Sequence, residues 1–180
     1  MADRPAHAAP ALDDPLIADP IMKLFFFRHA DASWPDWKGD DDDRPLTKRG
    51  HKDAKRMSKL LRQLDPHATL LLTSPLPRAS ETAEHVASAL RMPTQTETAL
   101  AKGFNRAKLE ALLKKIPDEE IILVGHEPDF SRVINELTGA RIRLEKSGLA
   151  LVQRDPVDGV TTLRWLLPVK LAKAARKKKK

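Results

Sequence analysis

The sequence lacks several features on which protein function often depends. It has no cysteine, which excludes a disulfide framework, a thiolate zinc site and a thiol nucleophile. No apolar stretch approaches the ~20 residues that a membrane-spanning helix needs. The first residues lack the basic segment and apolar core of a secretory signal. We therefore expect no transmembrane segment and a cytoplasmic location.

Composition predicts one folded domain between two disordered ends. The 180 residues are 41% hydrophobic and 32% charged, with only 4% aromatic residues, which is enough apolar content for one core. Residues 1–20 are rich in Ala, Pro and Asp and show no apolar periodicity, so a disordered leader is expected there. Residues 169–180 are expected to form a disordered basic tail, which leaves residues 21–168 as the domain.

The basic tail dominates the charge of the chain. Residues 170–180 hold seven positive charges, as many as the net charge of +7 of the whole sequence. A run of like charges attracts polyanions such as nucleic acid, polyphosphate or anionic lipid without specificity. A solvated tail with no partner is the simpler interpretation, and in neither case does the tail make the body a nucleic-acid-binding domain.

Apolar periodicity predicts alternating strands and helices. Strands are expected at short apolar runs, and helices where apolar residues recur at three- and four-residue spacing. The predicted strands cover residues 24–27, 69–73, 94–98, 121–124, 149–153 and 161–166. The predicted helices cover residues 47–64, 78–90, 105–115 and 128–138. This alternation predicts an α/β fold of three layers, α/β/α, in which helices cover both faces of a mostly parallel central sheet.

Cationic or titratable side chains follow three of the predicted strands. Arg28 and His29 follow the first apolar run, Arg78 begins the helix after the second strand, and His126 follows the strand at residues 121–124. Ligands of open α/β sheets bind beyond the carboxyl ends of the strands, so these side chains are expected to share one site. Guanidiniums and imidazoles donate N–H groups to a phosphoryl group, and an unprotonated imidazole can attack phosphorus. The residues alone leave open which histidine attacks.

A metal site is the main alternative interpretation of these residues. Two histidines suggest one, but two adjacent arginines would repel a cation. The four aspartates at residues 40–43 also suggest a metal, yet neighbouring side chains rarely converge on one ion, and a solvated loop is expected. We therefore expect no metal and no other cofactor. The remaining histidines have no comparable setting and are expected at the surface; they are His7, His51, His67 and His85.

Four segments resemble the signature blocks of the histidine phosphatase superfamily, also called phosphoglycerate mutase-like. In chain order they are FFFRHADA, RPLTKRG, LLTSPLPRASETA and ILVGHEPDFS, all within residues 22–167. The compact length and the motifs RHADA and GHEPD are most similar to SixA-type phosphohistidine phosphatases. The resemblance implies a phosphoglycerate mutase-like fold in which His29 is the phosphorylated nucleophile. It also implies that Arg28 and Arg78 bind phosphate and that His126 completes the pocket.

The sequence departs from the family pattern at the general acid. Many members carry a Glu near the position of residues 99–104, where this sequence reads Ala-Leu-Ala-Lys-Gly-Phe and has no carboxylate. Asp129 is the first candidate for a substitute acid, ahead of Asp31, Glu81 and Glu127.

The missing acid bears on the substrate. An alkoxide leaving group needs a proton, whereas a phosphorylated imidazole can be protonated from solvent. We therefore expect a phosphatase that acts on phosphohistidine of a protein. A small-molecule phosphomonoesterase for a sugar phosphate or nucleotide remains open, as does a non-catalytic phosphate-binding module. The expected partner is thus a phosphorylated protein or a small phosphorylated substrate.

Overall fold

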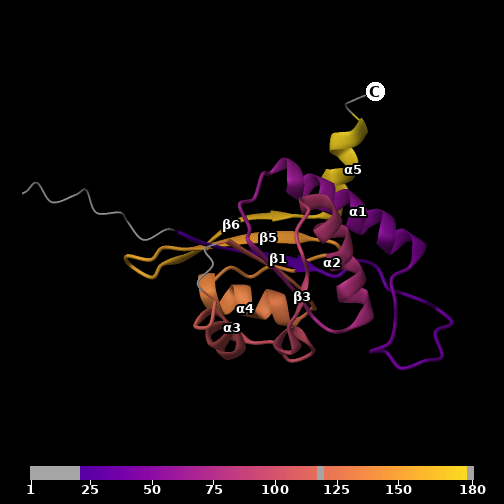
Figure 1. Ribbon diagram of the computed structural model, residues 1–180, viewed down its shortest axis with the longest axis horizontal. Coiled ribbons are helices and arrows are strands. Elements are labelled where there is room, and N and C mark those ends of the chain that lie inside the picture. The colour runs from indigo at the N-terminus through magenta and orange to yellow at the C-terminus, as the bar shows by residue number, and fades with distance from the viewer. Residues whose placement is uncertain (1–20, 117–119, 178–180) are drawn as a thin grey trace, which may run out of the picture.

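The centre of the protein is a six-stranded mixed sheet (Figure 1). The structure, a computed structural model, describes residues 21–116 and 120–177. The strands are arranged in the order β3-β2-β4-β1-β5-β6. They span Met22–Arg28 (β1), Leu70–Thr73 (β2), Gln95–Thr96 (β3), Glu120–Gly125 (β4), Leu149–Arg154 (β5) and Thr161–Leu167 (β6). The pairs β1–β4, β2–β4 and β2–β3 are parallel, and β1–β5 and β5–β6 are antiparallel. The predicted mostly parallel sheet is confirmed.

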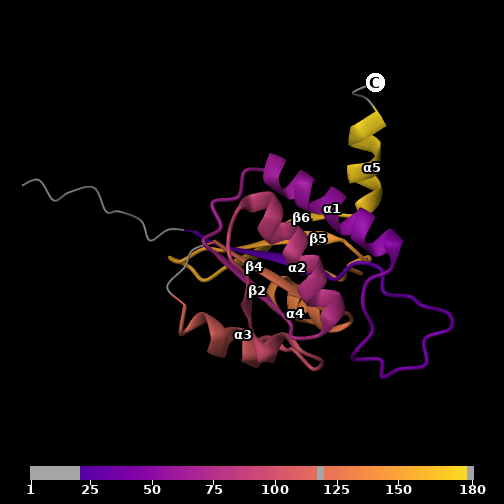
Figure 2. The same cartoon turned by 45° about the vertical axis from the view of Figure 1, so that its right-hand side comes forward.

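Helices cover both faces of this sheet. In the described part of the chain they span Lys48–Gln63 (α1), Pro77–Leu90 (α2), Arg106–Leu113 (α3), Asp129–Thr138 (α4) and Val169–Lys177 (α5), with a short 3₁₀ helix at Thr98–Leu100. Side chains of α1 and α2 pack in one core cluster and those of α3 and α4 in another. Figures 1 and 2 show the two helix pairs on opposite sides of the sheet. The predicted three-layer α/β/α architecture is therefore confirmed.

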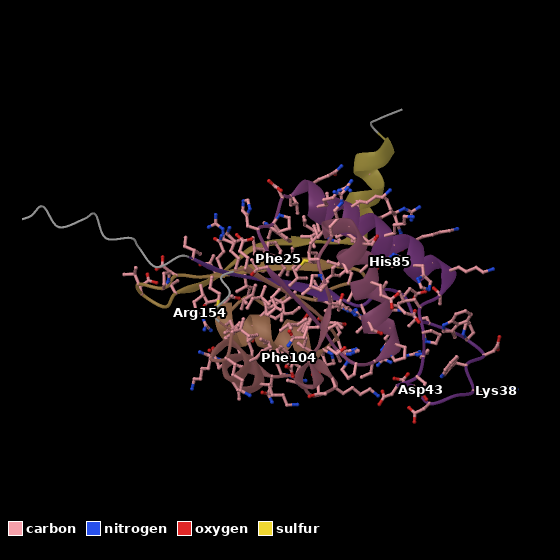
Figure 3. All side chains as sticks on the ribbon, viewed as in Figure 1. Phe25, Lys38, Asp43, His85, Phe104 and Arg154 are labelled. Carbon is pink, nitrogen blue, oxygen red and sulfur yellow. The ribbon has the colours of Figure 1, made fainter. Side chains whose placement is uncertain are left out.

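The apolar run of β1 is buried on both faces of the sheet. Leu24 and Phe26 belong to the cluster with α3 and α4, whereas Phe25 and Phe27 belong to the cluster with α1 and α2. Figure 3 shows Phe25 and Phe104 on opposite sides of the sheet. Because neither face of the strand meets water, the sequence reads as a continuous apolar run instead of an alternating one. Burial of each phenylalanine contributes about 1.5–3 kcal/mol relative to exposure.

Short-range hydrogen bonds define the helix ends. The Thr47 hydroxyl accepts from the Gly50 N–H at 3.0 Å at the start of α1, and the Asn105 side chain accepts from the Lys108 N–H at 3.0 Å at the start of α3. Gly139 ends α4 with a φ of 72°, a conformation that glycine adopts without strain. No helix within the described ranges has the length and apolar character needed to cross a membrane.

The C-terminal segment is helical, contrary to the predicted disorder. Val169 and Ala172 of α5 pack against the core cluster on the α1 side of the sheet. Lys173 Nζ donates to Oδ2 of the buried Asp53 of α1 at 3.0 Å. The prediction weighed the positive charges and overlooked apolar residues spaced three apart, which share one helix face. The predicted leader at residues 1–20 and the end of the predicted tail at residues 178–180 lie outside the described residues.

Candidate active site

A pocket of about 450 Å³ lies at the carboxyl edge of the sheet, where β2, β4 and β1 are neighbours. His29 directly follows β1, His126 directly follows β4, and Arg78 lies in the first turn of α2. The His29 N–H donates to the Gly125 carbonyl at 3.0 Å, which continues the β1–β4 pairing one residue past β1. The structure thus brings Arg28, His29, Arg78 and His126 to one pocket, and all four line it.

His29 is held as a neutral imidazole with one free nitrogen lone pair. Its Nδ1 lies 2.8 Å from the Ala30 carbonyl oxygen. A carbonyl can only accept, so Nδ1 carries the proton and Nε2 is left with its lone pair. Burial lowers the pKa of His29 to about 3, although the hydrogen bond to the Ala30 carbonyl opposes the shift. The neighbouring His126, Arg78 and Arg28 lower this pKa further. The ring is therefore neutral at physiological pH, and Nε2 can act as a nucleophile.

A hydrogen bond with Ser74 fixes the orientation of the His126 ring. Its Nε2 lies 2.8 Å from the Ser74 hydroxyl oxygen, which also accepts from the Leu76 N–H at 3.3 Å. A serine hydroxyl can donate to one group while it accepts from another, so we assign the serine hydrogen to Nε2 and the proton of His126 to Nδ1. That nitrogen is buried and has no hydrogen-bond partner among the described residues. Burial and the charge of Arg78 lower the pKa of His126 to about 4.

Arg28 and Arg78 are each anchored by one backbone carbonyl. Arg28 Nη1 donates to the Leu144 carbonyl at 2.9 Å, and Arg78 Nη1 donates to the Asp41 carbonyl at 2.7 Å. The Nε of Arg28 is buried without a partner in the described part of the chain. One anchoring bond orients each guanidinium and leaves other N–H groups for a ligand, an arrangement suited to the oxygens of a phosphoryl group.

Positive charge prevails around the pocket. The described lining includes the cations Arg28, Arg44, Arg78, Lys102 and Lys146 and the carboxylates Asp41, Glu127 and Asp129. The described residues include no group of three His, Cys, Asp or Glu side chains that could hold a metal ion. The pocket is therefore built for an anion, with two neutral imidazoles whose ring centroids are 5.2 Å apart.

Comparison with known proteins identifies the family. A model of the histidine phosphatase superfamily (branch 1) matches residues 24–104. An uncharacterised protein of Picosynechococcus is 34% identical over 165 residues, which cover 82% of this chain and 100% of that protein. This chain belongs to the histidine phosphatase superfamily.

SixA proteins are among the relatives of this histidine phosphatase. The phosphohistidine phosphatase SixA of Escherichia coli is 27% identical over 163 residues, which cover 85% of this chain and 99% of SixA. The solved structure of the protein histidine phosphatase SixA complexed with tungstate matches with a TM-score of 0.74 at 25% identity. That match covers 83% of this chain and 99% of the other. The predicted family and its phosphoglycerate mutase-like fold are confirmed.

Asp129, the first candidate for an acid, has a structural task in this histidine phosphatase. It lines the pocket, but its Oδ2 accepts from the backbone N–H groups of Gly103 and Phe104 at 2.7 and 3.1 Å. Its Oδ1 pairs with Arg132 at 3.3 Å. These three donors hold both carboxylate oxygens in place. Asp129 therefore fixes the turn at residues 103–104 against α4.

Glu127 has the environment of a protonatable carboxyl group. It lines the pocket beside His126 and is half-buried. Burial raises the pKa of Glu127, although a hydrogen bond from Ser131 and the charge of Arg28 oppose the shift. Its Oε1 accepts from the Ser131 hydroxyl at 2.8 Å. Of the other two carboxylates considered, Glu81 accepts from the Leu46 N–H at 2.8 Å and Asp31 pairs with Lys146 at 2.8 Å; neither lines the pocket.

Sequence reasoning missed four residues of this region. Ser74 carried a usable signal, because it directly follows a buried strand inside the segment LLTSPLPRASETA. Asp41 was considered only as part of a possible metal site. Neither Arg44 nor Lys102 carried a signal, because the path of their loops is set by tertiary contacts.

Proposed function

We propose that this histidine phosphatase removes phosphate from phosphohistidine on proteins, without a metal, through a covalent intermediate on His29. The observation that carries the proposal is the neutral state of His29. Its pKa is lowered to about 3 by burial, and its Nδ1–H is held by the Ala30 carbonyl. Nε2 is therefore an unprotonated nucleophile at neutral pH, beside two guanidiniums that can bind phosphoryl oxygens.

The reaction proceeds in two displacements at phosphorus. In the first, His29 Nε2 forms a P–N bond while the P–N bond to the substrate imidazole breaks and that imidazole takes a proton from solvent. In the second, water attacks phosphorus, the P–N bond to His29 breaks, and orthophosphate leaves as the proton of water passes to solvent. Arg28 and Arg78 offset the charge on the peripheral oxygens, and His126 donates from Nδ1.

The substrate class follows from the leaving group. The segment 99–104 contains Lys102 and no carboxylate, and the Asp129 carboxylate is occupied by Gly103, Phe104 and Arg132. A general acid contributes ~10²–10⁴-fold when the leaving group is a basic alkoxide. Phosphohistidine does not need that help, because its ring nitrogen can be protonated before the P–N bond breaks. The similarity to SixA supports the same substrate class.

One observation favours a second candidate, a small-molecule phosphomonoesterase. The raised pKa of Glu127, caused by burial, makes this pocket carboxyl easier to protonate. A protonated carboxyl group could supply the proton that an alkoxide needs.

A comparison of substrates tests the proposal. We expect kcat/KM for a phosphorylated histidine phosphotransfer domain to exceed that for a hexose phosphate by at least about tenfold, a threshold set below the ~10²–10⁴-fold that a missing acid withholds from an alkyl ester. Glu127→Gln should leave the reaction with phosphohistidine unchanged. A tenfold preference for the hexose phosphate, abolished in Glu127→Gln, would establish the second candidate instead.

Trapping the intermediate tests the nucleophile. Rapid quenching with a radioactive phosphoryl donor should give an acid-labile phosphoenzyme in the wild type and none in His29→Ala. Equal labelling of the variant would refute the role of His29. No turnover and no labelling with any phosphorylated compound would leave a phosphate-binding module.

A further inference from the structure

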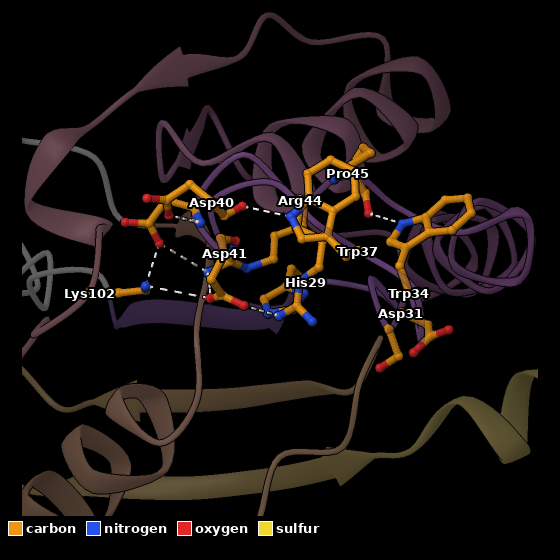
Figure 4. Close-up of polar contacts among 12 residues, drawn as sticks. His29, Asp31, Trp34, Trp37, Asp40, Asp41, Arg44, Pro45 and Lys102 are labelled. Atoms are coloured by element: carbon orange, nitrogen blue, oxygen red, sulfur yellow. Dashed lines mark hydrogen bonds and ion pairs between the residues drawn. The ribbon is translucent and has the colours of Figure 1, made fainter.

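The four consecutive aspartates, residues 40–43, form a turn beside the pocket, which we call the acidic loop. Asp40 holds this turn together: its Oδ1 accepts from the Asp42 N–H at 2.8 Å, and its carbonyl accepts from Trp37 Nε1 at 2.8 Å. All four residues are exposed. Figure 4 shows this turn next to His29. Asp41 Oδ1 pairs with Arg44 Nη2 at 2.6 Å. Asp41 Oδ2 and the Asp42 carboxylate interact with groups farther along the chain.

Asp41 and Asp42 interact with Arg78 of the pocket. The Asp41 carbonyl accepts from Arg78 Nη1 at 2.7 Å. Arg78 Nη2 lies 3.7 Å from Asp41 Oδ2 and 3.9 Å from Asp42 Oδ1. Lys102 holds the same two carboxylates from the other side, with 3.5 Å between its Nζ and Asp41 Oδ2 and a direct ion pair to Asp42. The acidic loop therefore places two negative charges next to a guanidinium that is expected to bind phosphate.

These contacts compete with a phosphate ion. Negative charge within about 4 Å of a guanidinium repels a dianion that uses the same N–H groups. The Arg78 side chain is only 5% exposed, so its charge is poorly screened, whereas the Asp41 and Asp42 side chains are 55% and 51% exposed. No buried apolar side chain anchors residues 40–43. Exposed ion pairs are weak, so an arriving ligand can displace these carboxylates from Arg78.

We propose that Asp41 and Asp42 are specificity residues that compete with phosphate for Arg78 and weaken the binding of free orthophosphate, the product of the reaction. The rest of a phosphorylated protein can make contacts outside the pocket that offset this competition, whereas orthophosphate has no further group to make them. The inference rests on the phosphate site of the proposed function, but it concerns binding and needs no turnover.

Orthophosphate binding to the double variant Asp41→Asn, Asp42→Asn tests the inference. The asparagines keep the side-chain size and the Asp41 carbonyl position that Arg78 contacts, and they remove both charges. We expect isothermal titration calorimetry at fixed ionic strength to show a Kd for orthophosphate about fivefold below that of the wild type, the upper end of the range for an exposed ion pair.

The matched control is Asp36→Asn, Asp43→Asn, which removes two charges from the same connection between β1 and α1. Neither residue has an ion pair with Arg78 in the described structure, so the Kd should stay within about twofold of wild type.

An unchanged Kd in the Asp41, Asp42 variant would overturn the inference. A raised Kd would also overturn it, because the carboxylates would then be holding Arg78 in its binding position. An equal decrease of the Kd in the control variant would show that only net charge matters, and it would overturn the inference as well. Orthophosphate binding without turnover of any substrate would remove the proposed function and leave this inference standing.

Discussion

At the residue scale, the two pocket histidines are neutral because the fold buries them among positive charges. Burial is the largest cause of the lowered pKa values, about 3 for His29 and about 4 for His126. In an unfolded chain both would titrate near 6.5. Between these values the unfolded chain binds more protons than the folded protein, so protein stability rises with pH across this window and falls as the pH is lowered.

We predict that the free energy of unfolding decreases as the pH falls from about 6.5 towards 4, by up to about 1.4 kcal/mol per pH unit for each histidine. His29→Gln removes one of the two groups, so its stability should depend less steeply on pH than that of the wild type. Urea denaturation at pH 7 and pH 5 measures both slopes. Identical slopes would mean that His29 does not titrate as its burial requires.

Ser74 acts through His126, and we predict that Ser74→Ala lowers kcat for an aryl phosphate about tenfold with little change in KM. Without the hydroxyl at 2.8 Å, the imidazole loses a buried hydrogen bond and its fixed tautomer, a loss of about 1–1.5 kcal/mol. Ser74→Thr keeps the hydroxyl and should restore most of the rate. Steady-state kinetics with equal kcat for wild type and Ser74→Ala would contradict a positioning role.

Arg78 is expected to touch the transferred phosphoryl group, and we predict that Arg78→Ala lowers kcat/KM by about 10²-fold or more. Arg78→Lys keeps the charge but not the planar guanidinium, so its kcat/KM should fall between those of the wild type and Arg78→Ala. A loss below about threefold in Arg78→Ala, measured with p-nitrophenyl phosphate, would place Arg78 outside the reacting centre.

At the scale of elements, α5 is part of the folded body. It packs Val169 and Ala172 onto the cluster beneath α1, and its Lys173 pairs with the buried Asp53. No described residue from 170 onward lines the catalytic pocket. The described part of the helix therefore contributes to stability without lining the pocket.

Deletion of residues 170–180 should lower the free energy of unfolding by roughly 1–2 kcal/mol, because apolar surface and a buried carboxylate are uncovered. It should leave kcat/KM for p-nitrophenyl phosphate within about twofold. Lys173→Met removes only the ion pair with Asp53. It should lower the free energy of unfolding by less than the deletion does, since Asp53 keeps its ion pair with Arg56 at 2.8 Å. Denaturation curves and steady-state rates measure the two effects. A collapse of kcat in the truncated protein would show that α5 shapes the site.

At the scale of the whole molecule, the strand order assembles the pocket. β1 lies beside β4 and β4 beside β2, so three strands from distant parts of the sequence end at one edge. His29 directly follows β1, and His126 directly follows β4. Arg78 lies in α2, which begins shortly after β2. In the proposed mechanism, Arg28, Arg78 and the neighbouring lysines supply the positive charge that a metal ion supplies in other phosphatases.

We therefore predict that excess EDTA leaves the hydrolysis of p-nitrophenyl phosphate unchanged. The arginines are covalently part of the protein and cannot be chelated. Initial rates before and after EDTA treatment provide the measurement. A loss of activity that added Mg²⁺ or Zn²⁺ restores would contradict the metal-independent mechanism.

The sequence by itself determined the strands, most helices and the four residues expected in the site. A strand buried on both faces must be continuously apolar, so residues 24–27 and 121–124 were identifiable from local pattern alone. The residues that follow such strands lie at the carboxyl edge of the sheet in any parallel arrangement. Local pattern therefore sufficed for Arg28, His29 and His126, and the resemblance to the family named His29 as the nucleophile.

Only the tertiary structure decided the state and the partners of these residues. The bond between Ser74 and His126 joins residues 52 positions apart, and that between Arg78 and Asp41 spans 37. Such contacts depend on which strands are neighbours and on how a loop folds back, and local periodicity does not encode either. The same reason explains why the sequence did not reveal the hydrogen bonds of Asp129 or the packing of α5. Their surroundings come from Gly103, Phe104 and Asp53, which only the folded chain brings into contact with them.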